Sequence, residues 1–128
     1  MSVLCLAAGK LVAAIPVAAF TLAWTHSIEK TRWEEDWRIA DGRLQVVAAR
    51  IHGSGAGMEM PDDATLVNGT WHYRPRLAPM PRVALAHSPY AAAYELCLAG
   101  GCRPLTDWFP AGDGPATITL SACAAARE

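Results

Sequence analysis

A histidine and a glutamate lie in phase with tryptophans in two strand-like segments of the first third of the chain. His26 is two residues from Trp24, and Glu35 lies between Trp33 and Trp37 at the same spacing. Side chains two apart share one face of a strand, so both polar groups belong to aromatic faces. A buried carboxylate must be paired or hydrogen-bonded, or its pKa rises until it takes up a proton. A hairpin joining the two segments brings His26 and Glu35 within reach and predicts a polar pocket floored by tryptophans.

Glu29, on the segment between them, is a third candidate member of this pocket. One hypothesis is a ligand-binding site; another is a metal-dependent or hydrolytic centre built from His26, Glu29 and Glu35. Ser27 supplies a hydroxyl beside the histidine, but no nucleophile-elbow motif surrounds it. The structural alternative is an ion pair that stabilises the hairpin, because ion pairs perturb titrating groups without catalysis.

A glycine-rich run, Gly53-Ser-Gly-Ala-Gly57, follows a Val/Ile-containing segment as a phosphate-binding loop does. The next residues add acids and a proline, where a dinucleotide-binding fold needs the start of a helix. Gly53, Gly55 and Gly57 therefore remain candidates for a backbone anion nest, or for positive φ angles at a bulge or tight crossing. No cofactor is expected.

Four cysteines are too few to imply a disulfide framework in a chain of 128 residues. Cys97 and Cys102 flank Leu-Ala-Gly-Gly at a hairpin tip. A four-residue loop places them opposite each other, where a disulfide is possible, whereas a Gly100-Gly101 turn strains the bridge. Reduced thiols packed as small apolar groups are the favoured interpretation, together with a cytoplasmic location; a periplasmic or membrane-associated location is the alternative.

Composition excludes several classes of protein. Hydrophobic residues make up 52% of the chain, which excludes a disordered polymer, and the net charge of −1 argues against nucleic-acid binding. The uncharged run of residues 11–24 is shorter than a membrane-spanning helix and contains Pro16. Lys10 follows an apolar segment rather than preceding it, the wrong order for a secretory signal. Two strands turning at Gly9-Lys10 are predicted, with no transmembrane span.

Period-two alternation and frequent turn signals run through the whole chain. They predict an all-β, single-domain antiparallel β-sandwich or small barrel of about ten short strands over residues 1–121, with residues 122–128 as a tail or short helix. The expected strands cover residues 3–8, 11–17, 20–26, 33–39, 43–52, 65–67, 70–74, 83–87, 94–99, 102–105 and 117–120.

Three stretches resemble a bacterial and archaeal family known as domain of unknown function 1850. The run from Phe20 to Ile39, with its His-Ser-x-Glu motif, resembles the family's opening signature, and Arg50–Glu59 resembles its glycine motif. Leu96-Cys97 followed by Cys102-Arg-Pro-Leu105 resembles its closing hairpin.

The resemblance implies a context rather than a reaction. Family members are encoded beside, or joined to, tripartite (TRAP-type, TAXI subclass) solute transporters, and no activity is assigned to them. The sequence therefore favours a non-enzymatic accessory or binding domain, whose partner is the transporter permease, its solute-binding protein or a small acidic solute. A small hydrolase or metal-dependent enzyme and a structural adaptor without a ligand are the alternatives. The family's motif positions correspond here to His26, Ser27, Glu29, Glu35, Gly53, Gly55 and Gly57.

Overall fold

Alternating buried and exposed residues form eleven strands in the part of the chain that the structure, a computed structural model, describes. That part comprises residues 2–25, 31–53, 62–86, 94–109 and 117–124. The elements are β1 (Ser2–Ala8), β2 (Leu11–Ile15), β3 (Ala19–Thr25), β4 (Arg32–Ala40), β5 (Arg43–His52), β6 (Thr65–Val67), β7 (Thr70–Tyr73), β8 (Arg82–Ala86), β9 (Glu95–Leu98), β10 (Gly101–Pro104), the 3-10 helix η1 (Leu105–Trp108) and β11 (Thr117–Ala124).

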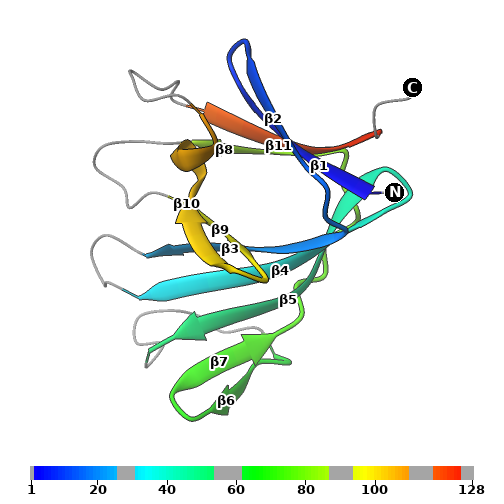
Figure 1. Ribbon diagram of the computed structural model, residues 1–128. Helices are drawn as coiled ribbons and strands as arrows, with labels where there is room; N and C mark the ends of the chain where they lie inside the picture. The colour runs from blue at the N-terminus through cyan, green and yellow to red at the C-terminus, as the bar shows by residue number, and fades with distance from the viewer. Residues whose placement is uncertain (1, 26–30, 54–61, 87–93, 110–116, 125–128) are drawn as a thin grey trace.

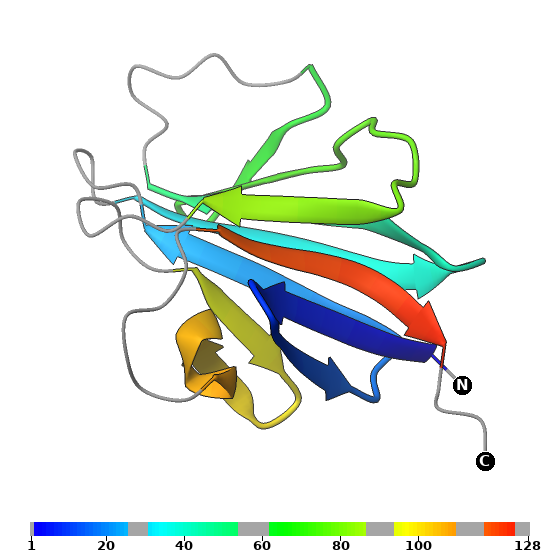
Figure 2. The same cartoon turned by 90° about the horizontal axis from the view of Figure 1, so that it is seen from above.

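The strands form two antiparallel sheets that pack face to face (Figure 1). The smaller sheet has the order β2-β1-β11-β8, and the larger has the order β10-β9-β3-β4-β5-β7-β6. Seen from above, strands of the two layers run in nearly the same direction, as in an aligned sandwich (Figure 2). The predicted all-β fold is confirmed, and of the two architectures expected from the sequence the sandwich is observed.

The core lies between the sheets. The inner sides of β1 and β11 supply Leu4, Leu6 and Leu120, each fully buried, against Leu22 of β3 and Leu44 of β5. The larger sheet has more strands than the smaller sheet that packs on it, and Figure 1 shows β7 and β6 extending away from the smaller sheet. The inner face of the larger sheet is therefore part core and part open flank.

Two predicted turns have the backbone that their residues favour. Asp41-Gly42 joins β4 to β5, and Asn68-Gly69 joins β6 to β7; all four of these residues have φ between 50° and 80°. Positive φ at both central positions is the mark of the type I′ hairpin turn, which Asn-Gly and Asp-Gly sequences favour.

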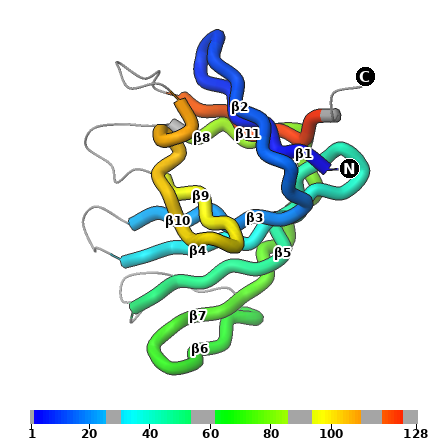
Figure 3. The backbone as a smooth tube through the Cα atoms, viewed as in Figure 1, coloured from blue at the N-terminus to red at the C-terminus, as the bar shows by residue number. Residues whose placement is uncertain are grey.

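The C-terminal end differs from the prediction. β11 continues through Ala124, so residues 122–124, predicted as part of a tail or short helix, are strand. Pairing of Ser2 with Ala124 explains the extension, because β1 offers hydrogen-bonding partners along its whole length. Figure 3 shows the start of β1 and the end of β11 on the same side of the molecule. No helix in the described part of the chain is long and apolar enough to cross a membrane.

The four cysteines form two disulfides, Cys5–Cys123 and Cys97–Cys102, instead of the reduced thiols that the sequence favoured. Cys5 and Cys123 are on neighbouring strands β1 and β11, a pairing that no local spacing indicates. In the β9–β10 hairpin the turn residues are Ala99 and Gly100, which sets Cys97 directly opposite Cys102. The opposed cysteines and their possible disulfide, expected from the sequence for a four-residue loop, are therefore observed, but on a two-residue turn.

Candidate functional site

Glu35 lies on the inner face of the larger sheet. Alternation along β4 puts Trp33, Glu35 and Trp37 on that side, and Trp37 is 5% exposed in the core. The cross-strand neighbours of Glu35 are Leu22 of β3 and Ala49 of β5, both buried. The strand alternation predicted from the sequence therefore places a carboxylate in a row of apolar side chains.

The Glu35 carboxylate has few polar contacts among the residues that the structure describes. Trp37 donates a hydrogen bond from Nε1 to Glu35 Oε1 over 3.4 Å, and no ion pair to Glu35 occurs within the described ranges. Burial raises the pKa of Glu35, and the Trp37 hydrogen bond opposes this only in part. The pKa values of Tyr73 and Tyr94 are also raised, first by burial and then by the negative charge of Glu35. Both phenols therefore lie in the electrostatic field of this carboxylate.

Aromatic rings continue the inner face toward the end of β3 and the start of β4. Trp24 stacks on Trp33 at 5.9 Å between ring centroids and meets Tyr94 at 5.4 Å. The Trp33 Nε1 atom is buried and has no hydrogen-bond partner among the described residues. Buried polar groups in native proteins are usually hydrogen-bonded, and a buried donor without a partner near a half-buried acid is a feature that can mark a functional site.

Of the seven residues singled out from the sequence, the structure describes Glu35 and Gly53. His26, Ser27, Glu29, Gly55 and Gly57 lie outside the described residues. Gly53 has φ of 130°, and a Cβ there would stand 3.5 Å from Thr31 Cγ2. Its N–H donates to the Gly69 carbonyl at 3.0 Å, so the observed role of Gly53 is to close β5 against the β6–β7 hairpin.

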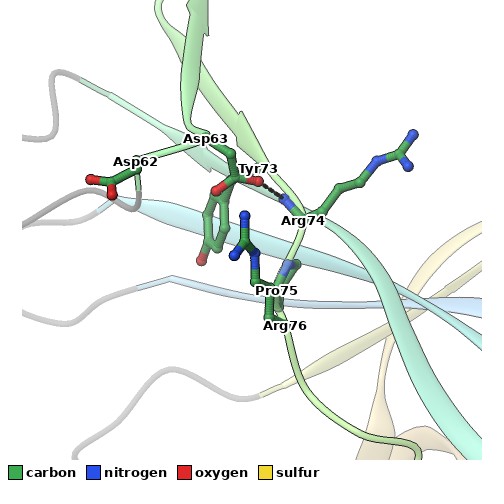
Figure 4. A pocket seen from close by; sticks show the side chains of 6 residues that line it. All are labelled: Asp62, Asp63, Tyr73, Arg74, Pro75 and Arg76. Atoms are coloured by element: carbon green, nitrogen blue, oxygen red, sulfur yellow. Dashed lines mark hydrogen bonds between the residues drawn. The ribbon is translucent and has the colours of Figure 1, made fainter.

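A surface pocket that the sequence did not predict opens beside β7 (Figure 4). Its volume is about 320 Å³, and Asp62, Asp63, Tyr73, Arg74, Pro75 and Arg76 line it. The Arg76 guanidinium lies beside the Tyr73 ring below the Asp63 carboxylate, whereas the Arg74 side chain points away (Figure 4). Asp63 Oδ2 accepts a hydrogen bond from the Arg74 backbone N–H at 3.1 Å.

The pocket is connected to the Glu35 row through Tyr73. Tyr73 pairs with Ala49, which in turn pairs with Glu35, so the three residues form one line across β7, β5 and β4. A second hollow of about 260 Å³ shares Asp63, Tyr73 and Arg74 with the first and reaches Ala49. Because Ala49 has only a methyl group, nothing larger separates the phenol from the acid on this line.

The outer face of the same sheet carries a network of ion pairs. Arg50 of β5 reaches Asp36 Oδ2 at 2.6 Å and Glu34 Oε1 at 3.2 Å, and Arg32 joins Glu34 to Glu95 of β9. Hydrogen bonds from Arg50, chiefly, hold the pKa of Asp36 below its usual value. For Glu34, burial raises the pKa, but hydrogen bonds from His52, Arg32 and Arg50 outweigh this effect, so the pKa is lowered. This network links β4 with β5 and β9, and Arg50 occupies the Asp36 carboxylate.

Replacing Glu35 by glutamine will stabilise the protein at neutral pH. The pKa of Glu35 in the folded state lies above the usual 4.5. The protonated carboxyl therefore contributes stability that is fully present below pH 4.5 and is lost as the pH rises through the folded-state pKa. Glutamine keeps the shape and removes the buried charge, a gain on the order of 1 kcal/mol or less after solvent screening. Urea unfolding at neutral pH and near pH 4 measures the difference, which should vanish at the lower pH.

The matched control is Glu34→Gln, one residue along and on the opposite face. The pKa of Glu34 is lowered, so this substitution should destabilise the protein at neutral pH. If both substitutions changed the free energy of unfolding by the same amount and in the same direction, the difference between the buried Glu35 and the ion-paired Glu34 would not be supported.

Comparison with known proteins places the chain in a family. The family model described as a domain of unknown function (DUF1850) matches residues 20–105, which include Glu35, Tyr73, Arg76 and both cysteines of the β9–β10 hairpin. No curated protein and no solved structure matches the sequence significantly. The match covers more than half of the chain, and the protein belongs to the DUF1850 family of domains of unknown function.

Proposed function

We propose that this chain is a non-enzymatic binding domain that serves a TRAP-type solute transporter, and that it binds a small acidic solute in the pocket beside Tyr73. The observation that carries the proposal is the Arg76 guanidinium, which lines this pocket and has no ion-pair partner in the part of the chain that the structure describes. An unpaired guanidinium beside a phenol binds a carboxylate through charge-assisted hydrogen bonds.

The rest of the pocket narrows the class of solute. Asp62 and Asp63 line it together with Arg76, so a second carboxylate on the ligand would meet like charge, whereas a hydroxyl or amino group would find an acceptor. Glu35 adds negative charge one row away, on the other side of Ala49. A compact acid with one carboxylate and one hydrogen-bond donor fits this distribution of charge.

The link to a transporter follows from what the family resemblance implies. Co-purification of the tagged chain with a TRAP-type permease or its solute-binding protein, identified by mass spectrometry, would support it. The two disulfides favour an oxidising compartment, because structural disulfides persist outside the cytoplasm. We therefore place the domain on the extracytoplasmic side, which was the alternative to the cytoplasmic location favoured by the sequence.

Substitution of Arg76 by glutamine should weaken binding of a hydroxy acid by about tenfold or more, the effect of one charge-assisted hydrogen bond. Isothermal titration with lactate as the probe measures this affinity, and uncharged lactamide tests whether the carboxylate is what the pocket recognises. Arg43→Gln is the matched control, since Arg43 is exposed and lines neither hollow beside Tyr73. Failure of the unmodified protein to bind lactate, or equal binding by R76Q, would refute the assignment of this pocket.

A further inference from the structure

The two disulfides of this protein differ in what surrounds them. Cys5–Cys123 joins two central strands of the smaller sheet and has a sequence separation of 118. Cys97–Cys102 has a separation of 5 and includes Cys102, an exposed residue on β10, the edge strand of the larger sheet. No strand covers Cys102 on its outer edge within the described part of the chain. The hairpin disulfide is therefore the more accessible one.

Opening the hairpin disulfide also disturbs the fold less. Loop-closure entropy grows with the logarithm of loop length, so the shorter loop restricts the unfolded chain roughly a hundredfold less than the longer one. The base of the hairpin is held independently: the Leu105 N–H donates to the Tyr94 carbonyl at 3.0 Å, and Leu105 is buried in the core. A folded protein with Cys97 and Cys102 separated is thus physically accessible.

The two sulfurs of this disulfide have different neighbours. Arg32 Nη2 lies 3.8 Å from Cys102 Sγ, and Glu34 and Glu95 hold Arg32 in that position. Cys97 instead lines a hollow of about 410 Å³, whose other lining residues include the apolar Ala19, Val47 and Ala99 as well as Asp36 and Arg38. A cation beside one sulfur stabilises negative charge that develops there, which makes Cys102 the better leaving group.

The hollow beside Cys97 contains one cation that is available to a ligand. Arg38 lines it, and within the described residues its one side-chain hydrogen bond goes to Gln45 Oε1, at 3.3 Å. The other charged group on this hollow, Asp36, is occupied by Arg50 and by the Thr21 hydroxyl. A thiol that carries a carboxylate can place that carboxylate on Arg38 while its sulfur approaches Cys97.

We propose that Cys97–Cys102 is a thiol–disulfide exchange site, at which a small carboxylate-bearing thiol attacks Cys97 and displaces Cys102. The attacking thiolate forms a new S–S bond with Cys97 Sγ as the Cys97–Cys102 bond breaks. The electron pair of the broken bond goes to Cys102 Sγ beside Arg32, and solvent then protonates that thiolate. The products are a mixed disulfide on Cys97 and a free thiol at Cys102, with no net oxidation.

Glutathione, which has two carboxylates, is the probe that tests this proposal. The oxidised protein is exposed to graded reduced glutathione, quenched with acid, alkylated and analysed by peptide mass spectrometry. The first product should be glutathione on Cys97 with alkylated Cys102, while Cys5–Cys123 stays intact. Opening of Cys5–Cys123 first, or attachment of glutathione to Cys102, would overturn the proposal.

Two arginine substitutions separate the roles of the flanking groups. Arg38→Gln should slow exchange with glutathione about threefold or more and leave exchange with uncharged 2-mercaptoethanol unchanged, because only the former has a carboxylate to place. Arg32→Gln should slow exchange with both thiols, because it acts on the leaving sulfur. Equal slowing of both thiols by R38Q would contradict the assigned role of Arg38, and that variant is expected to fold because Arg38 is exposed.

Discussion

Replacing Cys5 and Cys123 together by serine is expected to lower the free energy of unfolding by about 5 kcal/mol. The disulfide between them closes a loop with a sequence separation of 118, so its removal frees nearly the whole unfolded chain from a constraint. The native contacts should change little, because β1 and β11 still pair along six residue positions from Ser2 to Ala7. Guanidinium unfolding of the non-reduced protein measures the loss.

The Cys97→Ser, Cys102→Ser double variant is the matched control for this experiment. It removes a disulfide that closes a much shorter loop, and the same chain-entropy relation gives a loss of about 2 kcal/mol. Identical unfolding midpoints for the two double variants would mean that loop length does not govern the contribution of these disulfides.

Arg50→Met is the substitution with the second largest expected effect, a loss of about 2 kcal/mol at neutral pH. Arg50 is 26% exposed and donates to both Asp36 and Glu34, so its removal leaves two carboxylates without their shared cation. The cost lies between that of an exposed ion pair and that of a fully buried one. Methionine retains most of the apolar stem, so the loss reports on charge rather than on packing.

The effect of Arg50→Met should shrink in acid. The folded pKa of Asp36 lies below its usual 3.8, chiefly because of Arg50. The ionised Asp36 therefore contributes stability that is fully present above pH 3.8 and is lost as the pH falls through its folded-state pKa. Thermal unfolding of the variant and the parent across this range tests the sign. Arg38→Met, which removes an exposed arginine on the same face, is the control and should change stability by less than about 0.5 kcal/mol.

Local patterns predicted much of what positions the site. Alternation along β4 places Glu35 with Trp33 and Trp37, and this depends only on the two-residue period of a strand. The pocket at Tyr73 and Arg76 was not predicted. It forms where the end of β7 meets residues 62 and 63, and the hydrogen bond that joins the two segments, from Arg74 to Asp63, spans eleven positions in the sequence. Nothing in the spacing of these residues indicates that they meet.

The β4–β5 hairpin shows where local pattern stops being sufficient. The Asp41-Gly42 turn pairs Ala40 with Arg43, and counting from it in unbroken register sets Arg50 opposite Trp33, on the inner face. The structure has a bulge at Val47, and beyond it Arg50 pairs with Glu34. One extra residue moves every later side chain of β5 to the other face. The bulge therefore places the Arg50 side chain on the outer face of the sheet, where it joins the ion-pair network.

The sequence by itself determined the strands, the tight turns and the face on which Glu35 lies, because these depend on the two-residue period of a strand and on the φ preferences of a few turn residues. The tertiary structure decided the order of the sheets, the Cys5–Cys123 disulfide, the partners of Arg50 and the pocket at Arg76. Each of these joins residues far apart in the chain, and such contacts form only when the whole sandwich closes, so no local spacing encodes them.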